Sequence, residues 1–224
     1  WLLSRAINNS GIVDVAWASG FSILSIYYLL ATQHINNLPK WVLAGMVSIW
    51  SLRLSWHLTS RFLRWFPEED ARYADLKKKL GKNVNTKMYF IFLWQGAVLC
   101  FLTAPLAVAA LSSHKELGLI QFLATALWLI ALIGESLADA QLTTFVKNPA
   151  NKGRTCQIGL WSLSRHPNYF FEWLGAVAFS LFVCDMPLGI FTIACPLVLL
   201  HLLLNVTGVK PSEEHSALTR SDYA

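Results

Sequence analysis

Charged residues are scarce in this sequence: Asp, Glu, Lys and Arg make up 14% of the 224 residues, whereas 55% are hydrophobic. A soluble domain carries about a quarter charged residues, so the composition excludes a water-exposed globular fold. The apolar residues come in long blocks separated by short charged segments, which also excludes a disordered chain. This pattern predicts a polytopic membrane protein.

Cysteine pairs and metal-ligand motifs are equally scarce. The four cysteines form no CxxC pair, and three of them lie in apolar blocks, which excludes a disulfide scaffold. No HxxH, HExxH or ExxH spacing occurs that would fix a metal ion. We therefore expect no metal, although some potential ligands are present. These are His57, His166, His201, Glu135, Asp139 and Glu172.

Six apolar blocks approach the length of about 20 residues that a membrane-spanning helix needs. They cover residues 11–31, 41–60, 88–111, 117–140, 168–184 and 187–205. None alternates like a strand, and a helix satisfies its backbone groups within one segment. We predict an all-α fold, a transmembrane bundle of six helices in a single domain over residues 1–224. Pro105 and Pro196 should kink the third and sixth helices, and a seventh helix is expected upstream of Trp1.

The basic residues predict the orientation in the membrane. Fifteen of the 18 Lys and Arg residues fall at the two ends of the chain and in the two long loops, which six spans would place on one side of the bilayer. By the positive-inside rule, both ends and both loops are cytoplasmic. The segment from Pro67 to Lys87 should lie outside the bilayer and be partly helical. Because these charges flank membrane helices, nucleic-acid binding is not expected.

Ionisable residues inside spanning helices are costly and usually mark function. In this orientation the polar residues of the spans all fall in the cytoplasmic half of the bundle, which predicts a polar cavity open to the cytosol. They are Asp14, Arg53, His57, Arg61, Gln95, Glu135, Asp139, Asn168, Glu172, His201 and Asn205. Structural roles remain open: Arg53 or His57 pairing with Glu135 or Asp139, Arg61 extending to the interface, and His201 as a core histidine.

The segment from Lys147 to Glu172 combines basic residues with a helix start at Pro167. Exposed N–H groups and the positive end of the helix dipole favour an anion there. A pyrophosphate or a ribose phosphate would suit this site. The alternative is a basic loop that only follows the positive-inside rule.

Several motifs in this sequence resemble the steroid 5-alpha-reductase superfamily, and most closely its bacterial branch of uncharacterised membrane proteins. The motifs are Gly159-Leu160-Trp161, Ser164-Arg165-His166-Pro167-Asn168-Tyr169 with Glu172, Asn148-Pro149-Ala150-Asn151-Lys152-Gly153-Arg154, Asp14-Val15-Ala16-Trp17, Glu69-Asp70-Ala71-Arg72-Tyr73 and Gly208-Val209. The resemblance implies a bacterial inner-membrane protein that binds NADPH from the cytosol. Its implied reaction is reduction of a carbon–carbon double bond conjugated to a carbonyl in a lipophilic substrate.

The resemblance also implies which residues contact the cofactor. They are Glu135, Asp139, Asn148, Asn151, Arg154, Arg165, His166, Asn168, Tyr169, Glu172 and His215. Phe171 stands where the family usually has Gly and is expected to narrow the entrance. The sequence has no Gln-Glu pair on its first helix and no Tyr beside His57, so another lipophilic enone suits it as well as a steroid.

The reduction needs a hydrogen-bond donor for the carbonyl oxygen. Asp14, Arg53 and His57 are the candidate catalytic residues, with His57, or a protonated Asp14, as the donor. A structural Asp14–Arg53 ion pair is the alternative. The expected partners are a lipophilic substrate from the bilayer and membrane lipids, with the protein as a monomer.

Two other functions share these features. Membrane methyltransferases of the isoprenylcysteine or phospholipid type also carry Arg-His-Pro-x-Tyr and a later acidic pair, here Glu213-Glu214. Such an enzyme would bind S-adenosylmethionine instead of NADPH. A lipid-binding membrane protein without enzymatic activity is the third possibility.

Overall fold

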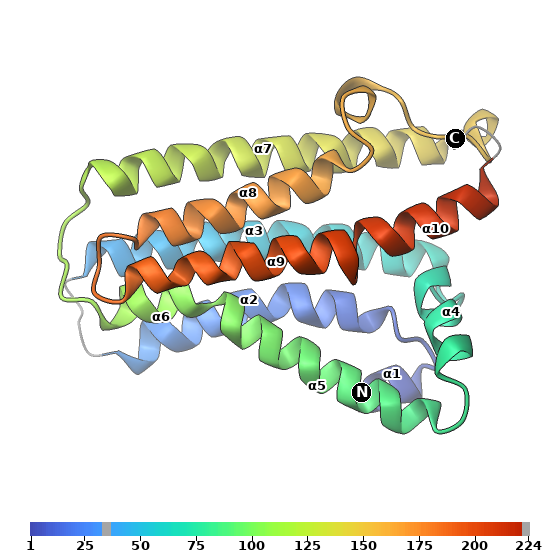
Figure 1. The fold of residues 1–224 in the computed structure, drawn as a ribbon, viewed down its shortest axis with the longest axis horizontal. Coiled ribbons are helices and arrows are strands. Elements are labelled where there is room, and N and C mark those ends of the chain that lie inside the picture. Colours follow the sequence, from blue (N-terminus) through green and yellow to red (C-terminus); the bar gives the residue numbers. More distant parts are fainter. Residues whose placement is uncertain (33–36, 221–224) are drawn as a thin grey trace. The chain divides into compact units, whose positions relative to one another are not determined.

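The computed structural model describes residues 1–32 and 37–220, and all regular elements within these ranges are helical. This confirms the predicted all-α class. Figure 1 shows the helices along the chain. They form two compact units, Trp1–Glu116 and Leu117–Ala224. We call them the N-terminal and the C-terminal unit. That residues 1–224 form a single domain stays a prediction.

The N-terminal unit contains six helices within its described residues. They are α1 (Leu2–Ala6), α2 (Ile12–Ala31), α3 (Leu38–Trp65), α4 (Ala71–Leu80), α5 (Val84–Leu102) and α6 (Ala104–Leu111). The predicted kink at Pro105 is confirmed, because the helix breaks at Thr103 and resumes as α6 with Pro105 in its first turn. A proline is tolerated there because its missing N–H breaks no helical hydrogen bond.

Helices α2 and α3 pack through small polar residues. The Ser51 hydroxyl donates to the carbonyl oxygen of Ala18 over 2.6 Å and accepts from the Ser22 hydroxyl over 2.8 Å. Small side chains let helix backbones approach closely, and such hydrogen bonds replace those to water inside a membrane. Asn37 then ties the start of α3 to the end of α6, since its amide donates to the carbonyl oxygens of Ala109 and Ser112.

The C-terminal unit is built on the helix pair α7 and α8. Its elements are α7 (Leu119–Lys147), the 3₁₀ turns η1 (Pro149–Asn151) and η2 (Gly159–Ser162), α8 (Pro167–Phe182), the 3₁₀ turn η3 (Gly189–Ile193), α9 (Ala194–Asn205) and α10 (Val209–Thr219). Pro167 begins α8, as the sequence predicts. The kink expected at Pro196 stays a prediction: the helix changes from the 3₁₀ form of η3 to α9 two residues before Pro196, which lies in the first turn of α9.

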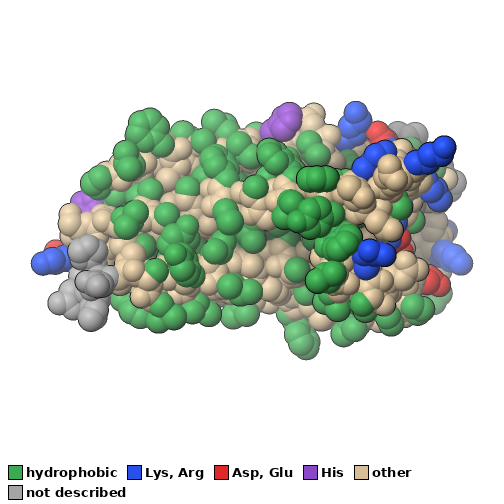
Figure 2. Space-filling model, turned by 90° about the horizontal axis from the view of Figure 1, so that it is seen from below, with side chains coloured by type: hydrophobic (Ala, Val, Ile, Leu, Met, Phe, Trp, Pro, Cys, Tyr) green, Lys and Arg blue, Asp and Glu red, His purple; other side chains and the backbone are tan. Residues whose placement is uncertain are grey.

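Four helices in the described residues are long and apolar enough to cross a membrane. They are Ile12–Ala31, Val84–Leu111, Leu119–Lys147 and Gly189–Thr219. Figure 2 shows hydrophobic side chains over much of the visible face. The length and composition of these helices are those of a membrane protein.

The predicted count of six spanning helices is not confirmed. Helix α3 is long enough but carries Arg53, His57 and Arg61, which lower its hydropathy. Helix α8 has 16 residues, a length of about 24 Å at about 1.5 Å per residue, whereas a bilayer core measures about 30 Å. The predicted helix within the segment from Pro67 to Lys87 is confirmed as α4.

Candidate functional site

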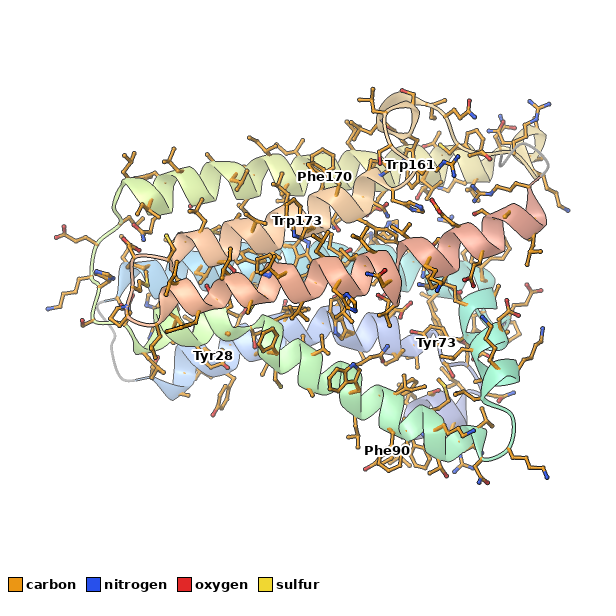
Figure 3. All side chains as sticks on the ribbon, in the orientation of Figure 1. Tyr28, Tyr73, Phe90, Trp161, Phe170 and Trp173 are labelled. Atoms are coloured by element: carbon orange, nitrogen blue, oxygen red, sulfur yellow. The ribbon has the colours of Figure 1, made fainter. Side chains whose placement is uncertain are left out.

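The loop before α8 is fixed against the last turns of α7. Gly159 has a φ of +55°, a left-handed conformation that favours glycine, and the Gln141 side chain occupies the space where a Cβ would be. The Gln141 side-chain oxygen accepts from the backbone N–H of Leu160 over 3.0 Å. The Trp161 indole donates to the carbonyl oxygen of Ala138 over 2.9 Å (Figure 3). These contacts set where α8 begins.

The packing of α7 on α8 places the polar residues that were predicted on these two helices at a similar height along the helix axes. The ring of Phe171 lies directly on Gly134, and Trp161 lies on Ala138. Because the two helices run antiparallel, residues 135 and 139 stand at the level of residues 172 and 168. Glu135 is 3% exposed and Asp139 is 7% exposed. The C-terminal unit therefore has buried carboxylates where α8 presents its own polar residues.

Asn168 carries the clearest sign of a binding site. Its side-chain oxygen Oδ1 is buried and has no hydrogen-bond partner among the described residues. A buried acceptor without a donor costs about 1–3 kcal/mol. Asn168 follows Pro167 in the first turn of α8, so the position can receive a donor from a ligand at the helix start.

Helix α10 returns to the start of α8. Nε2 of His166 lies 3.4 Å from Oε1 of Glu213, and Nη1 of Arg165 lies 3.9 Å from the same oxygen. The hydroxyls of Tyr169 and Ser212 are 3.5 Å apart. The rings of His166 and Tyr169 stack with centroids 5.4 Å apart. These polar contacts are long, so they hold α10 weakly.

His166 is the titratable residue at the centre of these contacts. Burial lowers its pKa below the usual 6.5, and this effect outweighs the hydrogen bond to Glu213, which acts in the opposite direction. The imidazole is therefore mainly neutral at pH 7. A neutral imidazole has one donor and one acceptor nitrogen, so it can bind a ligand in either role.

Other predicted site residues of this unit have local roles or lie apart. The Asn148 side chain accepts from the N–H of Ala150 over 3.0 Å, and the Asn151 amide donates to the carbonyl oxygen of Phe145 over 2.9 Å. Both therefore stabilise the turn after α7. Arg154 is exposed in the loop that follows. His215 lies in α10, but its side chain is outside the described part of the structure.

His201 differs from the expectation of a core histidine. It is exposed on α9, where its Nδ1 lies 3.3 Å from the side-chain nitrogen of Asn205. The apolar residues of this segment mark no single buried face, because nearly every neighbour is leucine or valine. The core assignment is therefore wrong.

In the N-terminal unit, Asp14 lies in a network of charges at the start of α2. Nη2 of Arg72 lies 2.9 Å from Oδ2 of Asp14 and 2.9 Å from Oδ2 of Asp70. The Tyr73 hydroxyl donates to Oδ1 of Asp14 over 2.5 Å, and Figure 3 labels Tyr73 on α4. Arg61 adds longer ion pairs of 3.5 Å to Asp14 and 3.4 Å to Asp70. The network joins α2, α3 and α4.

This network changes the interpretation of Asp14. The alternative left open by the sequence was an ion pair with Arg53, whereas the ion pairs described here involve Arg61 and Arg72. Arg61 therefore forms ion pairs within the unit, in addition to any extension toward the membrane interface. Arg53 and His57 are half-buried on α3, about two turns and one turn before Arg61. Their catalytic roles, and that of Asp14, stay predictions.

Sequence reasoning missed the residues that complete the network. Asp70, Arg72 and Tyr73 entered only as part of a motif that carried the family resemblance. Arg72 and Asp14 are 58 positions apart, and no periodicity links residues at such a distance. The available signal was the short acidic and basic segment directly after a long helix.

The pKa of Asp70 predicts how stability depends on pH. Burial alone would raise it, but the hydrogen bond and charge of Arg72 and the charge of Arg61 lower it from 3.8 to about 2. A carboxylate with a lowered pKa stabilises the fold above pH 4, and this contribution is lost as the pH falls from about 4 to about 2. The lowered pKa of Asp70 corresponds to a contribution of about 2 kcal/mol to the free energy of unfolding.

Asp70→Asn should remove this dependence. In unfolding experiments in detergent between about pH 6 and about pH 2, which run from about two units above the unperturbed pKa down to the lowered one, the parent should lose about 2 kcal/mol more than the variant. Other carboxylates titrate in both proteins and cancel in the difference. Equal losses in the two proteins would show that Asp70 makes no stabilising ion pair.

Comparisons with known proteins give a family and two partial relatives. An uncharacterized protein of Schizosaccharomyces pombe is 24% identical over 81% of this chain and 60% of its own length. A probable O-methyltransferase, ustE, of Ustilaginoidea virens is 35% identical over 37% of this chain and 30% of its own length. The chain thus spans less than two thirds of either relative. No solved structure matches it.

The family match covers the whole sequence. Residues 1–224 match the family described as "Protein of unknown function (DUF1295)", which is related to steroid 5-alpha-reductase-like proteins. The helical fold and the residues at the start of α8 are in keeping with this relation. The chain belongs to the DUF1295 family.

Proposed function

We propose that this protein is an integral-membrane reductase that uses NADPH to reduce a carbon–carbon double bond conjugated to a carbonyl in a lipophilic substrate. The observation that carries the proposal is the buried, unpartnered Oδ1 of Asn168 in the first turn of α8. An amide or a ribose hydroxyl of a dinucleotide supplies the donor that this oxygen lacks. The family relation supports the same cofactor.

The charge around this site favours a polyanionic cofactor. Lys147, Lys152, Arg154 and Arg165 are exposed before or at the start of α8. Arg165 is 56% exposed in its side chain and 3.9 Å from Glu213, so its guanidinium can turn toward a phosphate. We infer that the phosphates bind near Arg154 and Arg165. The dipole of α8 adds to this attraction.

The polar residues one and two turns further would hold the uncharged parts of NADPH. Asn168 and Glu172 on α8, and Glu135 and Asp139 on α7, are suited to the ribose and amide groups. Two further features complete the proposed site beside the start of α8. They are the turn after α7, which Asn148 and Asn151 stabilise, and the stacked rings of His166 and Tyr169.

The substrate needs a second set of residues. Hydride transfer to the β-carbon leaves negative charge on the carbonyl oxygen, and a preorganised donor stabilises it by about 3–4 kcal/mol in enzymes of known mechanism. His57 and Arg53 are the proposed donors. Asp14 is less suited, because its oxygens already accept from Arg72 and Tyr73. We further propose a bacterial inner-membrane location, with the cofactor entering from the cytosol.

Cofactor binding tests the proposal. Asn168→Ala and Glu172→Gln should each weaken NADPH binding about tenfold, the effect of losing one good hydrogen bond in a buried site. The measurement is the NADPH-dependent rise in melting temperature of the purified protein in detergent. The melting temperature without cofactor should stay close to that of the parent.

Asn205→Ala is the matched control, because Asn205 is an exposed asparagine on α9 of the same unit. It should bind NADPH like the parent. If Asn168→Ala and Glu172→Gln also bind like the parent, the site is not at the start of α8. If the parent itself shows no response to NADPH, the reductase proposal fails.

A methyltransferase is the second candidate. It is supported by the contact of Glu213 with Arg165 and His166, and by the name of the partial relative, a probable O-methyltransferase. The same melting experiment with S-adenosylmethionine separates the two. A response to S-adenosylmethionine alone favours the methyltransferase, and a response to neither cofactor favours a lipid-binding protein without enzymatic activity.

A further inference from the structure

The junction of α4 and α5 concentrates positive charge that the proposed function does not use. Residues 76–115 include no acidic residue. Five lysines lie within residues 77–87. Lys77 forms an ion pair with Glu69 over 2.6 Å. The side chains of Lys78, Lys79 and Lys82 are exposed at the surface. Lys78 reaches Asp75 over 3.4 Å with both side chains more than half exposed, and such a surface pair contributes little.

Helix α1 adds a cation to the same surface from a distant part of the sequence. The Trp1 indole donates to the carbonyl oxygen of Asn85 over 3.1 Å, and its ring meets the Tyr89 ring edge-on at 5.4 Å. The Arg5 guanidinium lies over the Trp1 ring at 5.1 Å. Helix α1 therefore lies beside the first turns of α5 (Figure 1). Arg5 is thereby held near the start of a candidate membrane span.

Large apolar side chains border these charges. Leu2 and Leu3 of α1 are 77% and 58% exposed, and Phe90 and Trp94 of α5 are 62% and 66% exposed. Figure 3 shows Phe90 pointing away from the helices. Phe90 and Trp94 lie in the first part of Val84–Leu111, which is a candidate membrane span. Among aromatic residues, Trp and Tyr concentrate at the level of lipid headgroups.

We propose that the basic–aromatic surface formed by α1, the α4–α5 junction and the first turns of α5 binds the headgroup of an anionic membrane lipid. Cations and exposed aromatic rings stand together where the span begins, which is the depth of lipid phosphates. A soluble acidic partner would leave Leu2, Leu3, Phe90 and Trp94 without an apolar environment. A lipid satisfies both parts of the surface, with its headgroup at the lysines and its chains along α5.

The test compares lipids and variants of the full chain in a neutral detergent. Retention of phosphatidylglycerol and of phosphatidylcholine with the same acyl chains is measured by native mass spectrometry and by the rise in melting temperature. The parent should prefer phosphatidylglycerol. The triple variant K78Q/K79Q/K82Q should bind it at least about tenfold more weakly, since each basic residue near an anionic surface contributes about fivefold.

The matched control is R64Q/K115Q/K210Q, which removes three exposed cations that lie outside both this surface and the proposed cofactor site. It should keep the preference for phosphatidylglycerol. The proposal is overturned if the parent shows no preference, if K78Q/K79Q/K82Q keeps it, or if the control loses it equally. A rise in melting temperature with glycerol phosphate as large as with the lipid would also overturn it, because the site would then bind phosphate without a membrane.

Discussion

Replacing Arg72 by Met should lower the free energy of unfolding by about 3 kcal/mol, the low end of the range for removing one partner of a buried ion pair. Arg72 binds Asp14 and Asp70 together, each over 2.9 Å. The side chains of these three residues are 22–29% exposed, so water compensates only in part for the lost guanidinium. Two carboxylates would then face each other across the space that the cation occupied.

The loss should appear as a lower melting temperature and a lower midpoint in denaturant titrations in detergent. Arg64→Met is the control, because Arg64 is an exposed arginine near the end of α3. Its effect should stay within about 0.5 kcal/mol. The loss of stability in Arg72→Lys should lie between the losses in Arg72→Met and Arg64→Met. Lys keeps the charge but not the geometry with which Arg binds two carboxylates. Unchanged unfolding of Arg72→Met would show that the network does not stabilise the unit.

Most helices could be predicted from the sequence because apolar length is a local property. The blocks at 11–31, 88–111 and 117–140 coincide with α2, with α5 and α6, and with α7. The break near Pro105 was predictable because proline removes a backbone donor wherever it occurs. The block at 168–184 likewise coincides with α8, although 16 residues are fewer than the about 20 that a membrane-spanning helix needs.

The grouping within the C-terminal unit was partly predictable. Pairs four residues apart, such as Glu135 with Asp139, share a helix face by geometry alone. Their level relative to Asn168 depends on how α7 packs on α8. That packing is set by Gly134 under Phe171 and by Trp161 on Ala138, and neither contact has a local signal in the sequence.

The charge network of the N-terminal unit was beyond prediction for the same reason. Asp14 and Arg72 meet because the chain turns after α3, and the backbone N–H of Ser10 is bound by Glu69 over 2.8 Å. These are contacts between segments far apart in the sequence. A motif can mark such residues as unusual, but it does not reveal their partners.

Gly134→Leu should destabilise the C-terminal unit by about 3 kcal/mol, the upper end of the usual cost of overpacking a core. Any Cβ at residue 134 would collide with the ring of Phe171, and the ring is held in the helix pair α7–α8. Gly96→Leu is the control, since nothing lies within 4 Å of a Cβ built at Gly96 on α5. There the change should be neutral or stabilising, because Gly in a helix interior costs up to about 1 kcal/mol.

A size exchange tests whether this contact is specific. Phe171 of α8 packs on Gly134, a glycine of the opposite helix. The double variant Gly134→Leu with Phe171→Gly moves the large side chain from α8 to α7. It should recover at least about half of the stability lost by Gly134→Leu, because directly contacting residues couple by up to about 3 kcal/mol. If the two substitutions were simply additive in unfolding experiments, the ring of Phe171 would not be what excludes a side chain at residue 134, and the level of Asn168 relative to Asp139 would need another cause.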